Sequence, residues 1–140
     1  MTIREMADMT ANITHDYQVE PDVYYAFQRC SSDYNPMHTD VKYAQEKGFD
    51  NRVMYGNILN TFLSHFVGML LPTRSVMILS QSINYRKPFY LHDIISLDAS
   101  IEQVSEAAGF ITYKFKFWRV GEEGNSQMIA NGSIQVGLIK

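Results

Sequence analysis

An apolar segment from Asn57 to Leu71 carries the pattern that most narrows the folds open to this chain. Its hydrophobic residues recur in pairs four positions apart, which predicts a helix with one broad apolar face. Such a helix would be roughly 22 Å long. That is short for a membrane span, and the segment also carries Asn60, Ser64 and His65. We therefore predict a buried helix at the centre of the protein, ended by Pro72.

After Arg74 the pattern changes from the period of a helix to the period of strands. Apolar and polar residues alternate, which indicates one buried and one solvated face, as in an antiparallel sheet. An earlier strand is expected from Ile13 to Glu20, before a helix that begins at Pro21. The later strands are predicted at Val76–Arg86, Ile94–Val104, Phe110–Val120 and Gln127–Leu138. A single curved sheet wrapped around the long helix satisfies this order, giving an α+β fold in one domain over residues 1–140.

Composition excludes several other classes of protein. Hydrophobic residues make up 46% of the chain and charged residues 19%, which is typical of a soluble globular domain. The net charge of −3 argues against nucleic-acid binding, which needs a basic face. The single cysteine, Cys30, excludes an internal disulfide and is expected to pack as a small apolar residue. Met1 to Thr10 has no apolar signal-peptide core, so we expect a cytoplasmic protein with no membrane segment.

The segment before the long helix concentrates the reactive side chains. Asn35-Pro36 is a turn signal, because proline disfavours the helical conformation of the residue before it. The simplest interpretation is a surface turn that carries a solvated histidine. Alternatively, the turn brings Asp33 and His38 to face one point, where a carboxylate and an imidazole can position a water and move its protons.

Gly56 stands at the predicted start of the long helix. The first N–H groups of a helix have no partner within it, so they form an anion site at the positive end of its dipole. A glycine there lets a ligand oxygen approach the backbone. An acid–base pair with such an oxyanion donor is what proton transfer next to a carbonyl requires.

The pattern D-x-N-P-x-H-x-D-x-x-x-A-x-x-x-G-F, followed by V-x-x-G and an apolar helix, resembles the hydratase motif of the MaoC-like hotdog family. The resemblance covers nearly the whole chain and implies the hotdog fold. It implies that Asp33 and His38 are the catalytic pair and that the Gly56 N–H is the oxyanion donor. It also implies substrate-binding roles for the following residues: Asn35, Val53, Tyr55 and Ser64.

The chain departs from the family pattern at three places. Ser32 stands before the aspartate where the family usually has glycine, and Tyr55 stands before the helix glycine in place of histidine. A later loop that usually reads Gly-Asp is His92-Asp93 here. None of these changes removes the Asp33–His38 pair, but Tyr55 lies nearest to the expected chemistry.

By this resemblance the protein is expected to be a hydro-lyase: an (R)-specific enoyl thioester hydratase or 3-hydroxyacyl thioester dehydratase. The substrate would itself carry coenzyme A or the phosphopantetheine of acyl carrier protein, with no separate cofactor and no metal. Arg52, Arg86 and Lys87 are candidates to meet the phosphates or an acidic carrier. The edge of a single sheet needs covering, and hotdog relatives form dimers, so we expect at least a homodimer.

Three alternatives stay open. A hotdog acyl-CoA thioesterase would use the same fold, but its common signatures place an acid on the central helix, and Asn57–Leu71 contains none. A non-catalytic acyl-thioester-binding protein is compatible with Ser32 and Tyr55. A metal site built from Asp33, His38 and Asp40 has suitable ligand types but lacks the histidine-rich or cysteine-rich set of a stable site.

Overall fold

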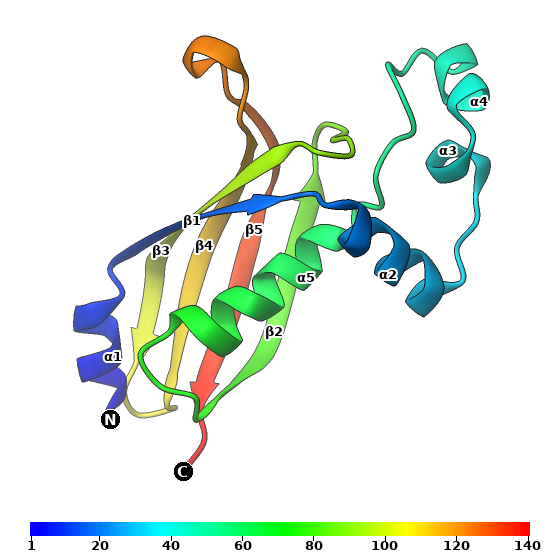
Figure 1. Ribbon diagram of the computed structural model, residues 1–140. Helices are drawn as coiled ribbons and strands as arrows, with labels where there is room; N and C mark the ends of the chain where they lie inside the picture. Colours follow the sequence, from blue (N-terminus) through cyan, green and yellow to red (C-terminus); the bar gives the residue numbers. More distant parts are fainter.

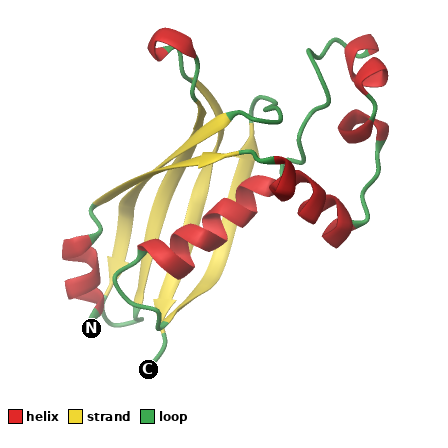
Figure 2. Cartoon of the chain, in the orientation of Figure 1, coloured by secondary structure: helices red, strands yellow, loops and turns green.

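The computed structural model describes residues 1–140 and consists of one antiparallel sheet curved around one central helix, as the sequence predicts (Figure 1). The strands lie in the order β1-β3-β4-β5-β2, so that β1 and β2 form the two edges. Helix α5 (Ile58–His65) lies across the concave face (Figure 2). The strand bounds are β1 Asn12–Gln18, β2 Val76–Tyr85, β3 Ile94–Ser105, β4 Phe110–Arg119 and β5 Gln127–Leu138.

Alternating apolar residues of the middle strands form the core against α5. Leu97 of β3 pairs with Phe117 of β4, and Ala99 pairs with Phe115, all four being buried. Strand β5 departs from the predicted alternation, because a bulge opposite Phe117 and Trp118 turns Ile129 into the core beside Ala130. The main-chain carbonyl of Ile129 accepts hydrogen bonds from the N–H groups of Arg86 and Lys87 at the end of β2.

The central helix is shorter and less regular than predicted. The α-helix begins at Ile58, and its last turn, Phe66–Leu70, is a π-helix. Phe66, Val67 and Leu71 are buried, and Leu70 is partly buried against the same core. None of the helices in the protein combines the length and the apolar composition that a membrane span requires.

Four other α-helices and a 3₁₀ turn at Glu122–Gly124 complete the chain. Helix α1 (Ile3–Met9) was not predicted, although Thr2 and Glu5 form a capping box at its start. Helix α2 (Pro21–Ser31) begins at the predicted proline, and α4 (Val41–Glu46) is capped by the side chain of Asp40. Helix α3 (Pro36–Thr39) is a single helical turn within the segment that the sequence predicted to be a turn. Figure 1 shows α2, α3 and α4 grouped beyond one end of α5, away from the two termini.

The expectation for one side chain was wrong. Cys30 is exposed rather than packed, because α2 extends past the end of α5 and nothing covers its C-terminal turn. His15 and His65 are half-buried, since β1 brings His15 and Tyr17 against α5. The Tyr17 hydroxyl lies 2.9 Å from Nδ1 of His65, and its ring stacks on Phe62 with 4.4 Å between ring centroids.

Candidate active site

Asp33 and Asn35 shape the short connection between α2 and α3. The Asp33 Oδ1 atom accepts a hydrogen bond from the Asn35 N–H at 3.0 Å, which closes an Asx-turn. In the same way, the Asn35 side chain accepts from the Met37 N–H at 3.0 Å and caps α3, whose first residue is Pro36. These local bonds leave the second carboxylate oxygen of Asp33 free to face His38.

The imidazole of His38 is held by a main-chain carbonyl from a distant part of the chain. Its Nδ1 lies 2.7 Å from the carbonyl oxygen of Val53. Because a carbonyl oxygen only accepts, Nδ1 must carry the proton, so Nε2 of the neutral ring presents its lone pair. That Nε2 lies 3.9 Å from Oδ2 of Asp33, which is too long for a direct hydrogen bond. The gap suits a small group with two O–H donors, such as water.

Gly56 lies just before α5 and presents a free donor to the same region. Its N–H makes no hydrogen bond with any group of the chain. A Cβ at this position would come within 3.1 Å of the Tyr85 ring, so any larger residue would require the ring or the backbone to shift by a few tenths of an ångström. The Tyr85 hydroxyl in turn donates to Oδ1 of Asn57 at 2.7 Å and accepts from Asn60 at 3.1 Å.

Two adjoining cavities share three lining residues, His38, Gly56 and Tyr85. The smaller, about 240 Å³, holds the polar groups and is also lined by Phe27, Asp33, Tyr55 and Asn57. The larger, about 340 Å³, is mostly apolar, and its other lining residues are Phe49, Val53, Met54, Leu59, Arg86, Lys87, Pro88 and Phe89. An apolar cavity that opens onto a small polar one is a suitable shape for a chain with a reactive group at one end.

Tyr55 is buried behind the catalytic candidates. Only 2% of it is exposed, and its ring lies against the His38 imidazole with 4.2 Å between centroids. Its hydroxyl donates to the main-chain carbonyl of Asp33 and accepts from Nε2 of Gln28 at 3.2 Å. Burial raises the pKa of the Tyr55 phenol, so it keeps its proton.

The predicted site residues fall into two groups. Asp33, His38, Val53, Tyr55 and Gly56 line one or both cavities. Asn35 is exposed and acts as the cap of α3, and Ser64 is exposed on α5 outside both cavities.

Other polar side chains do not join the pair. Asp40 points its carboxylate at the Tyr43 N–H as a helix cap. No three histidine, cysteine, aspartate or glutamate side chains converge as a metal site would require.

Two residues of this region were not predicted from the sequence. Gln28 lies on α2 and contacts both Tyr24 and Tyr55, but a glutamine on a partly exposed helix carries no distinctive signal. Tyr85 ends β2 and reaches Gly56 only because the sheet curves back towards the start of α5.

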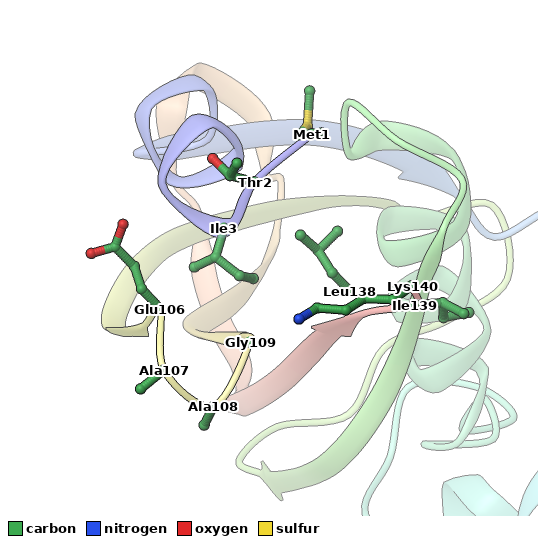
Figure 3. A pocket seen from close by; sticks show the side chains of 10 residues that line it. All are labelled: Met1, Thr2, Ile3, Glu106, Ala107, Ala108, Gly109, Leu138, Ile139 and Lys140. Carbon is green, nitrogen blue, oxygen red and sulfur yellow. The ribbon is translucent and has the colours of Figure 1, made fainter.

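A third cavity, about 440 Å³, lies at the opposite end of the molecule, between the two termini and the β3–β4 turn (Figure 3). Glu106 borders it and pairs with Arg4 at 3.3 Å, and Lys140 borders the other side. No imidazole or carboxylate pair like that of Asp33 and His38 lines it.

Comparison with known proteins decides the family. Residues 4–116 match the model of the family described as "MaoC like domain". The chain belongs to this family. Among curated MaoC-like relatives, an (R)-specific enoyl-CoA hydratase from Aeromonas caviae is 25% identical over 96 residues, which is 69% of this chain and 72% of the relative. A mitochondrial 3-hydroxyacyl-[acyl-carrier-protein] dehydratase from Arabidopsis thaliana is 31% identical over 70 residues, covering 50% of this chain and 41% of that protein.

Solved structures establish the hotdog fold of this MaoC-like chain. The (R)-hydratase from A. caviae aligns with a TM-score of 0.80 at 21% identity, over 91% of this chain and 93% of that one. A variant of an acyl-CoA hydrolase from Staphylococcus aureus aligns with a TM-score of 0.61 at 12% identity, over 93% of this chain and 67% of that one. Because the two neighbours are named for different reactions, the fold alone does not choose between hydration and hydrolysis.

Two of the departures from the MaoC-like pattern have a common structural basis. Ser32 has φ of 57° and His92 has φ of 71°. Both stand where the family motif usually has glycine, the residue that adopts a left-handed conformation without strain. At both positions a residue with a Cβ therefore adopts the conformation that glycine favours.

Proposed function

We propose that this protein catalyses the reversible hydration of a trans-2-enoyl thioester to a 3-hydroxyacyl thioester. One observation carries the proposal: Asp33 Oδ2 and His38 Nε2 face each other at 3.9 Å, in a cavity that also contains Gly56. The hydratase and dehydratase names of the relatives favour the same reaction, and the (R)-specific relatives favour the R configuration of the product.

The pair would hold one water between them. Each hydrogen of that water would be donated to one of the two acceptors, Oδ2 of Asp33 and Nε2 of His38. As the water oxygen bonds to the β-carbon of the substrate, one of the acceptors takes a proton from that water. The protonated acceptor then delivers this proton to the α-carbon from the same side. The sum is one water added across the carbon–carbon double bond, with the pair returned to its starting state.

Negative charge develops on the thioester oxygen during this addition. The free N–H of Gly56, at the positive end of α5, is the donor proposed to stabilise that oxygen. Because the donor is part of the backbone, it needs no reorganisation during the reaction. Removing one oxyanion donor typically costs roughly 3 kcal/mol in the transition state.

The substrate class follows from the larger cavity. Its apolar lining suits an acyl chain or the pantetheine arm, and Arg86 and Lys87 bring two cations without carboxylate partners to it. Those cations are proposed to meet the phosphates of coenzyme A or the acidic surface of an acyl carrier protein.

A second copy of the chain is the proposed partner. Edge strand β2 has one side unpaired, and the exposed side chains on it include Met77, Ile78 and Leu79. A long, apolar, uncovered edge strand favours pairing with another strand. Since β2 ends at Tyr85, a homodimer formed along it would lie close to both cavities.

The deciding experiment mixes the purified protein with crotonyl-CoA and follows the loss of enoyl absorbance, with a thiol reagent present. The proposal predicts loss of absorbance without thiol release, abolished in Asp33→Asn. Thiol release would indicate a thioesterase instead. If neither signal changes on crotonyl-CoA or on a carrier-linked enoyl substrate, and the substrate is recovered unaltered from a tight complex, the protein is an acyl-thioester-binding protein.

A further inference from the structure

A branched set of hydrogen bonds connects one side chain of α2 to both members of the candidate catalytic pair. The Gln28 Nε2 atom lies 3.3 Å from the Tyr24 hydroxyl and 3.2 Å from the Tyr55 hydroxyl. The Tyr24 hydroxyl lies 2.6 Å from the main-chain carbonyl oxygen of His38, and the Tyr55 hydroxyl lies 2.5 Å from that of Asp33. One amide therefore meets two phenols, and each phenol meets one residue of the pair.

The direction of every bond in this set is determined. A carbonyl oxygen only accepts, so the single proton of each phenol is committed to the backbone of Asp33 or His38. Each phenol oxygen can then only accept from Gln28, which requires the amide nitrogen, and not the amide oxygen, to face both tyrosines. Tyr24 and Tyr55 are 1% and 2% exposed, so water does not compete for these bonds.

The Asp33–His38 pair needs these hydrogen bonds because the segment around Asp33 is exposed to solvent. The Asp33 side chain is 44% exposed, and its segment is otherwise held by short-range bonds to Ser31 and Asn35. Tyr55 reaches this segment from 22 positions further along the chain, and its ring also packs on His38. The tyrosines therefore fix the backbone on both sides of the 3.9 Å gap.

We propose that Gln28 is a positioning residue for the Asp33–His38 pair, acting through Tyr24 and Tyr55; this rests on the hydratase function proposed above. Gln28 lines neither cavity, so it does not touch the substrate. Its amide N–H groups keep both phenol protons directed at the two backbone carbonyls. The Tyr55 hydroxyl positions Asp33, because its single proton is donated to the Asp33 carbonyl.

The first test compares Gln28→Leu and Gln28→Glu with Tyr25→Phe, a control on the same helix whose exposed phenol makes no hydrogen bond. A glutamate has the shape of glutamine, but its carboxylate would draw the phenol protons away from Asp33 and His38. Both Gln28 variants should therefore lower kcat on crotonyl-CoA by about 10- to 100-fold, with little change in KM. Wild-type kcat in Gln28→Glu, with the fold intact, would overturn the proposal.

A second measurement separates positioning from a role in folding. Because Gln28 acts partly through Tyr55, the loss of kcat in a Gln28→Leu/Tyr55→Phe double variant should be smaller than the product of the two single losses. Independent losses that multiply would contradict the proposal. Tyr55→Phe also keeps the ring against His38 and serves if Gln28→Leu does not fold.

The third measurement needs no substrate, so it distinguishes failure of this proposal from failure of the hydratase function. Nitrogen chemical shifts of the His38 ring report its tautomer, which the Val53 carbonyl holds as Nδ1–H in the native protein. Gln28→Leu should give a mixture of tautomers, and Tyr25→Phe should not. An unchanged His38 tautomer together with unchanged kcat in Gln28→Leu would refute the positioning role. A wild-type protein that hydrates no enoyl thioester would refute the proposed function, but the tautomer measurement would still test the positioning role.

Discussion

The ring of Tyr85 lies across Gly56 so closely that a methyl group on the glycine would sit 3.1 Å from it. Asn57 and Asn60 both hydrogen-bond the Tyr85 hydroxyl, so the ring is held in this place. Both cavities include Tyr85 and Gly56, so they meet at this contact. One contact between β2 and the start of α5 therefore sets the space around the proposed oxyanion donor.

Gly56→Ala should lower kcat/KM on crotonyl-CoA by about tenfold, because the added methyl group displaces either the ring or the backbone N–H. Gly68→Ala is the matched control: a Cβ there meets nothing within 4 Å. It should leave kcat/KM unchanged. Equal rates in both variants would show that the Tyr85–Gly56 contact has no part in the reaction.

His38→Asn should reduce kcat by roughly 100- to 10,000-fold, the usual loss for a well-placed acid or base. The asparagine amide can still donate to the Val53 carbonyl, as Nδ1 of His38 does, but it has no counterpart of Nε2. Circular dichroism should show an intact fold. Asp16→Asn, at an exposed position of β1, should keep wild-type kcat, and substantial turnover in His38→Asn would remove Nε2 from the mechanism.

Ser32→Gly and His92→Gly should each raise the free energy of unfolding by about 1 kcal/mol, because glycine adopts positive φ without the clash of a Cβ. Urea unfolding measures the change. Ser32→Ala is the control: it removes the hydroxyl but keeps the Cβ, so it should leave the strain in place. Stabilisation by Ser32→Ala as large as that by Ser32→Gly would contradict the conformational explanation.

Burial raises the pKa of Tyr17 to about 12, and burial also raises that of Tyr113. The folded protein therefore keeps these phenol protons at a pH where the unfolded chain loses them. Their contribution to stability is complete below pH 10 and is lost as the pH rises towards 12. Between pH 10 and 12 the urea concentration at the unfolding midpoint should fall less steeply with pH in Tyr17→Phe than in the wild type. Tyr25→Phe should show the same pH dependence as the wild type.

Leu79→Glu should shift the protein from dimer to monomer in light scattering, because it places a charge on the exposed apolar edge of β2. Met9→Glu makes the same change at an exposed residue of α1 and should not alter the mass. A wild-type protein that is monomeric at assay concentrations would contradict the proposed dimer.

Regular patterns in the sequence were enough to predict most of the fold. Strand β5 was predicted with its observed bounds, and the start of α2 was predicted at Pro21. The failures fall where packing overrides a local pattern. The bulge at Ile129 moves an apolar residue into the core against the regular period, and a π-helical turn after His65 replaces the last turn of the predicted α-helix.

Periodicity predicted a buried helix enclosed by a sheet, and the family motif predicted that Asp33, His38 and Gly56 would lie near the start of that helix. How the pair is held depends on contacts between distant segments of the chain. The Val53 carbonyl meets His38 across 15 positions of chain, and Tyr55 meets Asp33 across 22. Periodicity and turn signals describe neighbours within a few residues, so they contain no information about contacts that form only when the sheet closes around α5.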